Sequence, residues 1–166
     1  MGSNLAIVLI AVLLGYFLVS RYILASAPPV PAAQVESVQP GTKLPAIDVG
    51  WEKSDKNILL VLSTACKYCT ESLPFYKKLS ESKAGDTRLI VAFAQDRNEA
   101  AQYLATKQVA VDEILEAPPN QFNVRGTPTL LVVDGQGIVQ EVWAGKLPPE
   151  KENEILARLN GGSSAK

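Results

Sequence analysis

The stretch that decides the fold runs from Asn57 to Leu79, with the sequence NILLVLSTACKYCTESLPFYKKL. Its apolar run, Ile58 to Leu62, has the length of one buried strand, and the small residues Ser63 to Ala65 predict a turn. Beyond Cys66-Lys67-Tyr68-Cys69, apolar residues recur three and four positions apart, which predicts a helix. The stretch therefore predicts two thiols at the first turn of a helix, on the edge of a sheet.

This position predicts redox chemistry for the two cysteines. The start of a helix carries partial positive charge and free N–H groups, which favour the thiolate at Cys66, and Lys67 adds a nearby positive charge. Cys69 is three residues further on and can close a small disulfide with Cys66. We expect Cys66 to attack a substrate disulfide and Cys69 to resolve the mixed disulfide, with Lys67 and Tyr68 as tuning residues.

Two simpler interpretations of the cysteine pair are an inert structural bridge and half of a zinc site. Zinc takes four ligands, usually Cys or His, and this chain has no His and no further Cys. A zinc site would need a second chain or carboxylates. The position directly after a predicted strand favours redox chemistry, so we expect no metal and no cofactor.

Composition limits the other possibilities. A chain of 166 residues with 47% apolar and 20% charged residues can bury one core. The net charge of −1, without a basic cluster, argues against a nucleic-acid partner.

The N-terminal segment, residues 1–24, is predicted to be a transmembrane anchor. Leu5 to Val19 carries no charge, and with the residues to Leu24 it reaches about 20 residues, enough to cross a bilayer if Arg21 snorkels. The alternative is a cleaved signal peptide, since Ala25-Ser26-Ala27 resembles a cleavage site. The absence of Lys and Arg from Met1 to Asn4, and Pro28 directly afterwards, favour a retained anchor.

Residues 25–43 form a predicted proline-rich linker, and residues 161–166 a flexible polar tail.

The topology of the anchor is ambiguous from charge alone, because Arg21 on the C-terminal flank would place the following domain in the cytoplasm. Disulfides form and persist outside the cytoplasm. We therefore expect a single-pass protein of the inner membrane with its domain on the periplasmic side.

Residues 44–160 are predicted to form one globular domain. A short edge strand or extended lead-in at Leu44–Val49 and a polar turn at Gly50–Lys56 come before the central strand. The expected later elements are strands at Arg88–Ala94, Thr129–Val133 and Ile138–Trp143, helices at Arg97–Lys107 and Pro149–Leu159, a weak extended segment at Val109–Leu115 and one helical turn at Asn120–Val124. Helices between apolar strands, then a hairpin, predict an α/β fold with a mixed sheet.

The motifs together resemble a known family. They are the strand leading into Cys66-x-x-Cys69, Pro74 five residues later, and Val124-Arg125-Gly126-Thr127-Pro128-Thr129 before a strand and an Asp-Gly-x-Gly hairpin. In these features the chain is similar to thioredoxin-fold proteins, and most to the TlpA/ResA-like membrane-anchored thiol–disulfide oxidoreductases. The resemblance implies a thioredoxin-like mixed sheet flanked by helices.

The resemblance also implies a substrate site. Pro128 matches a family proline that is cis and lies against the cysteines, and its missing N–H leaves the backbone of Thr127 free to pair with substrate. The implied partners are exported proteins that carry a disulfide or a dithiol, and an upstream redox partner. The direction of electron flow stays open.

The chain departs from the family in places. Ala65 stands where the family usually has Trp, and Ile58 to Leu62 lacks the buried acid that many relatives keep near the thiols. The nearest acid is Glu71, which a helix could simply expose to water.

Three other functions compete. A peroxiredoxin-like peroxidase would use Ser63-x-x-Cys66 and Arg125, but Leu59 occupies the position of its motif's proline. A copper-delivery module typically needs a distant His, which this chain lacks. A redox-inactive adaptor would only hold peptide in the groove near Pro128.

Overall fold

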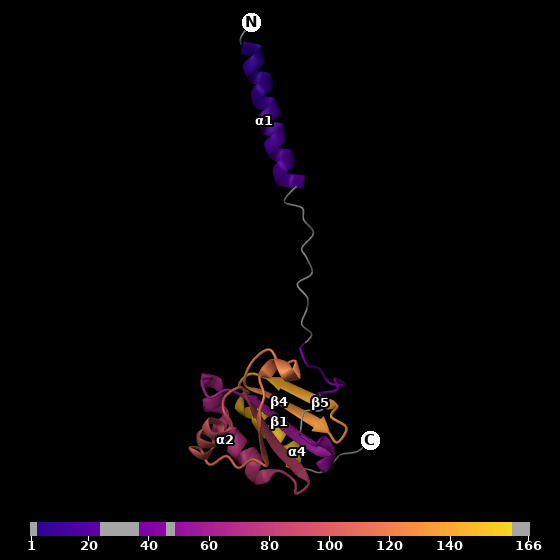
Figure 1. The fold of residues 1–166 in the computed structure, drawn as a ribbon, viewed down its shortest axis with the longest axis vertical. Helices are drawn as coiled ribbons and strands as arrows, with labels where there is room; N and C mark the ends of the chain where they lie inside the picture. Colours follow the sequence, from indigo (N-terminus) through magenta and orange to yellow (C-terminus); the bar gives the residue numbers. More distant parts are fainter. Residues whose placement is uncertain (1–2, 24–36, 46–48, 161–166) are drawn as a thin grey trace. The chain divides into compact units, whose positions relative to one another are not determined.

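The protein is described by a computed structural model that covers residues 3–23, 37–45 and 49–160 (Figure 1). The chain divides into two compact units, Met1–Val35 and Glu36–Lys166. The possible cleavage site at residues 25–27, the linker up to residue 36 and the tail at 161–166 lie outside the described residues.

The first unit contains helix α1 (Ser3–Ile23). Its described side chains, those of residues 7–17, are exposed, and the large ones among them are apolar or aromatic. Among the residues that the structure describes, no helix is long and apolar enough to cross a membrane.

In the second unit, the described residues form one five-stranded mixed sheet flanked by helices, which confirms the predicted α/β fold (Figure 1). The order across the sheet is β3 (Glu113–Glu116), β2 (Thr87–Phe93), β1 (Lys56–Leu62), β4 (Thr129–Asp134) and β5 (Val139–Ala144). The β1–β2 and β2–β3 pairs are parallel, and the β1–β4 and β4–β5 pairs are antiparallel.

The central strand β1 has a hydrophobic core on each face. Because side chains alternate along a strand, Ile58, Leu60 and Leu62 enter one core, while Leu59 and Val61 enter the other. All five are fully buried. Covering both faces explains why this stretch is an unbroken apolar run and not an alternating pattern.

Different elements cover the two faces. Helices α2 (Lys67–Ser82), α3 (Arg97–Ala105) and α4 (Pro149–Asn160) supply apolar side chains to the core that contains Ile58. Two 3-10 helices, η1 (Trp51–Lys53) and η2 (Pro119–Phe122), lie at the opposite core. That core is closed by apolar residues in and before η1 and in and beside η2: Val38, Leu44, Val49, Trp51, Leu115, Ala117, Phe122 and Val124.

The structure corrects several expected bounds. The segment from Leu44 is no strand where it is described: only Lys43 bridges to Ile138, and residues 46–48 lie outside the described residues. Strand β3 begins later than expected. Before it, the Asp112 N–H donates to the Leu89 oxygen at 2.8 Å, but the N–H of Leu89 donates to the Asp112 carboxylate at 2.6 Å and not to a backbone oxygen.

The expected polar turn at Gly50–Lys56 contains helix η1, and strand β1 starts at Lys56, two residues before the apolar run. Asn57 explains this earlier start. It is fully buried, and its side-chain amide donates to the backbone oxygens of Trp51 and Ser54, each at 3.1 Å.

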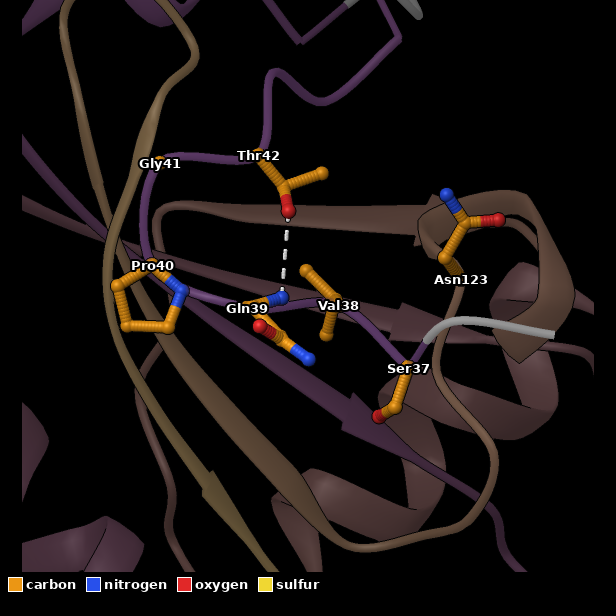
Figure 2. A pocket seen from close by; sticks show the side chains of 7 residues that line it. All are labelled: Ser37, Val38, Gln39, Pro40, Gly41, Thr42 and Asn123. Atoms are coloured by element: carbon orange, nitrogen blue, oxygen red, sulfur yellow. Dashed lines mark hydrogen bonds between the residues drawn. The ribbon is translucent and has the colours of Figure 1, made fainter. Parts of the chain in front are cut away.

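A surface pocket of about 380 Å³ lies beside the opposite core, lined by residues 37–42 and Asn123. Figure 2 shows its lining, with the backbone N–H of Gln39 donating to the Thr42 hydroxyl at 3.2 Å. The lining side chains carry no charge and include none of the predicted site residues.

Candidate functional site

The cysteine pair and the Thr127-Pro128 dipeptide meet at one edge of the sheet because of strand register. Antiparallel pairing places Val61, near the end of β1, opposite Thr129, at the start of β4. The residue after β1 and the residue before β4 therefore lie at the same edge. The Thr127–Pro128 peptide bond is cis.

Cys66 occupies the N-cap position of α2, the last residue before the helix. Its Sγ accepts the backbone N–H of Cys69 at 3.2 Å, as the side-chain oxygen of Ser or Asp does at other helix starts. As a neutral thiol it donates to the carbonyl oxygen of Thr127 at 3.3 Å. The structure thus brings together the predicted pair and Thr127, which is 61 residues away.

The two cysteines are free thiols with different surroundings. Cys66 is partly exposed at the surface, whereas Cys69 is fully buried among the side chains of the core beneath α2. A substrate disulfide can therefore reach Cys66 and not Cys69.

The pKa values of the two thiols shift in opposite directions. Burial by itself raises the pKa of Cys66. Hydrogen bonds from the side chains of Cys69 and Thr127 and from the backbone at Cys69 and Tyr68 outweigh burial, so the pKa lies below the ordinary 9.0. Burial and the hydrogen bond to Cys66 raise the pKa of Cys69 to about 12. Cys66 is the thiol that ionises first.

The two residues between the cysteines face solvent. The Lys67 side chain is 82% exposed and its ammonium lies 3.8 Å from the Glu71 carboxylate, one helical turn on. Tyr68 is 56% exposed. Glu71 also accepts a hydrogen bond from Lys146 at 2.7 Å, and this bond is the first cause of the lowered pKa of Glu71. The positive charge expected from Lys67 is therefore partly balanced by Glu71.

Sequence reasoning missed a second set of polar residues next to the site. Gln95, Glu99 and Tyr103, on or just before α3, form hydrogen bonds with residues on either side of Cys66. The sequence predicted that Ser63 lies in a turn, but its partner Gln95 is 32 positions away and belongs to no motif. Only the pairing of β1 with β2 brings these segments together.

Within the described residues, no group of three or more His, Cys, Asp and Glu side chains is placed to hold a metal. The two free thiols can exchange with a disulfide, and once joined as a disulfide they can exchange with a dithiol.

A family model for the thioredoxin-like domain matches residues 46–160, more than half of the chain. The chain belongs to the thioredoxin-like domain family. Among curated protein sequences, none matches it significantly.

Solved structures with this thioredoxin-like fold share little sequence with the chain. A thiol:disulfide interchange protein from Bacteroides sp. has a TM-score of 0.60 and 16% identity, over 78% of this chain and 95% of that one. A putative thiol:disulfide interchange protein DsbE from Chlorobium tepidum has a TM-score of 0.55 and 22% identity, over 73% and 98%. StoA from Bacillus subtilis has a TM-score of 0.52 and 14% identity, over 64% and 84%. At these identities the similarity shows a shared thioredoxin-like fold.

Proposed function

We propose that the protein is a thiol–disulfide oxidoreductase that exchanges disulfides with exported proteins through Cys66 and Cys69. The observation that carries the proposal is the geometry of Cys66: a partly exposed Sγ at a helix start that accepts the N–H of Cys69 at 3.2 Å. The interchange functions in the names of the structural neighbours agree with it.

The first step is attack by the Cys66 thiolate on one sulfur of a substrate disulfide. A bond forms between Cys66 Sγ and that sulfur, the substrate S–S bond breaks, and the other substrate sulfur leaves as a thiolate. The Cys69 N–H holds the attacking sulfur in place. Because Thr127 lies against Cys66, a substrate backbone that pairs with Thr127 would bring its disulfide to the thiolate.

The second step releases the substrate. Cys69 attacks Cys66 Sγ, the mixed disulfide breaks, and the proton of Cys69 ends on the departing substrate thiolate. The products are the Cys66–Cys69 disulfide and a reduced substrate. Every step is reversible, so the same pair can oxidise a dithiol when it starts as the disulfide.

An insulin-reduction assay with the reduced domain tests the proposal. We expect the wild type to reduce insulin and Cys69→Ser to accumulate a mixed disulfide through Cys66. If neither variant exchanges with any disulfide, while the domain is folded, the proposal fails. Peroxide consumption or tight copper binding would instead support the peroxidase or the copper-delivery module.

We further propose that the N-terminal segment tethers the domain to the inner membrane, with the domain on the periplasmic side. The support is the uncharged run Leu5 to Val19, the exposed apolar side chains of residues 7–17 in α1, and the chemistry, since disulfides persist outside the cytoplasm. The charge of Arg21 favours the reverse orientation.

Protease treatment of cells with a permeable outer layer and an intact inner membrane tests this topology. We expect digestion of the domain under these conditions. In untreated cells that are fractionated, we expect the full chain in the membrane fraction. Protection until the cells are lysed would place the domain in the cytoplasm, and release into the soluble fraction would show that there is no anchor.

A further inference from the structure

Three polar side chains spaced four residues apart point from the α3 region toward the segment around Cys66. Gln95 precedes α3, and its Nε2 donates to the hydroxyl of Ser63 at 3.2 Å. Glu99, in the first turn of α3, accepts the hydroxyl of Thr64 at 2.6 Å. Ser63 and Thr64 directly follow strand β1, so both bonds hold the turn that leads into Cys66.

The third side chain, Tyr103, acts on the other side of Cys66. Its hydroxyl lies 3.0 Å from the hydroxyl of Thr70, and Thr70 Oγ1 donates to the carbonyl oxygen of Cys66 at 3.4 Å. With Thr70 donating to Cys66, Tyr103 donates to Thr70. A chain of two hydrogen bonds therefore connects α3 to the backbone of the reactive cysteine.

These contacts enclose the backbone that sets the direction of Cys66 Sγ. The Cys66 N–H donates to the oxygen of Ser63 at 3.1 Å, and the Thr70 N–H donates to the oxygen of Cys66 at 3.2 Å. Both backbone bonds of Cys66 thus go to residues that α3 side chains also hold. The bond from the Cys69 N–H to Sγ needs this first turn in place.

We propose that Gln95, Glu99 and Tyr103 form a positioning face that keeps the Cys66 thiolate on the N–H of Cys69. The proposal rests on the proposed function and names residues that act through other residues. In the described residues, each of the three side chains bonds to a residue near Cys66 and not to its sulfur. Their effect is to hold the first turn of α2 in the arrangement that stabilises negative charge on Cys66.

The test measures the pKa of Cys66 from the pH dependence of its alkylation in the reduced protein, for Tyr103→Phe, Thr70→Val and the double variant. We expect each single variant to raise the pKa and to lower the thiolate population at pH 7 by roughly two- to tenfold, the range of a single hydrogen bond. The double variant should match the larger single effect, because both changes break one chain.

Two further variants separate positioning from general stability. Thr70→Ser keeps the hydroxyl and should retain the wild-type pKa. Ser82→Ala removes a hydroxyl at the other end of α2, where Ser82 donates to Lys78, and should leave the pKa unchanged. Thr70 is exposed, so removing its hydroxyl leaves the core intact.

An unchanged Cys66 pKa in Tyr103→Phe and Thr70→Val, with or without a lower unfolding midpoint, would overturn the positioning role. If the two pKa shifts add in the double variant, Tyr103 and Thr70 do not act through one chain of hydrogen bonds. Alkylation needs no protein substrate. A wild type that fails in insulin reduction, with pKa shifts present in the variants, would therefore refute the proposed function and leave the positioning role standing.

Discussion

Cys66 and Cys69 lie three residues apart, yet they have opposite surroundings. Cys66 is partly exposed and receives hydrogen bonds, which lower the pKa of its thiol. Cys69 is fully buried in the core below α2, and burial raises the pKa of its thiol to about 12. One helical turn separates a sulfur that ionises readily from one that stays protonated at neutral pH.

The difference comes from position in the helix and not from residue type. The N-cap residue sits outside the helix with its side chain over the free N–H groups, whereas a residue in the first turn can point inward to the sheet. In the proposed function, this difference assigns attack to Cys66 and resolution to Cys69, although the two side chains are chemically identical.

The largest expected effect is that of removing either thiol. Cys66→Ser should abolish insulin reduction, because no other exposed thiol exists in the chain. Cys69→Ser should still form mixed disulfides but release substrate slowly. Mass spectrometry of the trapped species identifies the attacking sulfur. Mixed disulfides that form through Cys69 in the Cys66→Ser variant would reverse the assignment.

A pH titration of the reduced wild type should show the difference directly. Thiolate absorbance is expected to rise in two separate steps, the first below pH 9.0 and the second near pH 12. Labelling at the first step should modify Cys66. A single step near pH 9 for both thiols would mean that their surroundings do not differ.

The same shifts predict how stability depends on pH. The folded state favours the Cys66 thiolate, so the stability of the reduced domain should rise as the pH rises through the folded pKa of Cys66 toward 9.0. The folded state disfavours the Cys69 thiolate, so stability should fall above pH 9 as the unfolded chain ionises. Denaturant unfolding at several pH values measures the free energy of unfolding, which should be highest between the two trends. In the Cys66→Ser variant, the rise toward pH 9.0 should be absent and the fall above pH 9 should remain.

A smaller effect is expected at the N-cap. Cys66→Ala removes the acceptor for the Cys69 N–H and should lower the free energy of unfolding of the reduced domain by roughly 0.5 to 1 kcal/mol. Cys66→Ser keeps an acceptor and should retain the stability or increase it. Equal unfolding midpoints for Ala and Ser would show that the sulfur does not cap α2.

The smallest effect is expected at Lys67. Its ammonium is 82% exposed and lies against Glu71, so Lys67→Gln should change the Cys66 pKa by less than the hydrogen-bond variants do. Alkylation rates at low and high salt measure the difference. A shift as large as that of Thr70→Val would assign Lys67 the tuning role that the sequence suggested.

The sequence predicted the parts of the molecule that repeat a simple physical pattern. Strand β1 appears as an unbroken apolar run, and α2 as a helical spacing after two cysteines. The predicted starts of strands β1 and β3 were wrong, and polar side chains bond to the backbone at both places. Asn57 is polar but fully buried, so the apolar pattern does not reveal the start of β1. Just before β3, the Asp112 carboxylate accepts the N–H of Leu89 in place of a backbone oxygen.

The site was predictable in part for the same reason. Cys66 and Cys69 are visible from their spacing, and Thr127 and Pro128 from resemblance to a family motif. The positioning face was not predictable, because Gln95, Glu99 and Tyr103 are ordinary residues whose partners depend on strand pairing. Such contacts between distant segments leave no local pattern in one sequence.

The pairing of Val61 with Thr129 has a consequence for the newly made chain. During synthesis the two cysteines emerge well before Thr127, and until β4 joins β1 the thiol of Cys66 lacks one of the groups that lower its pKa. The pairing of β1 with β4 therefore adds to the lowering of the Cys66 pKa, and a chain whose sheet is incomplete should hold less of this thiol as the thiolate.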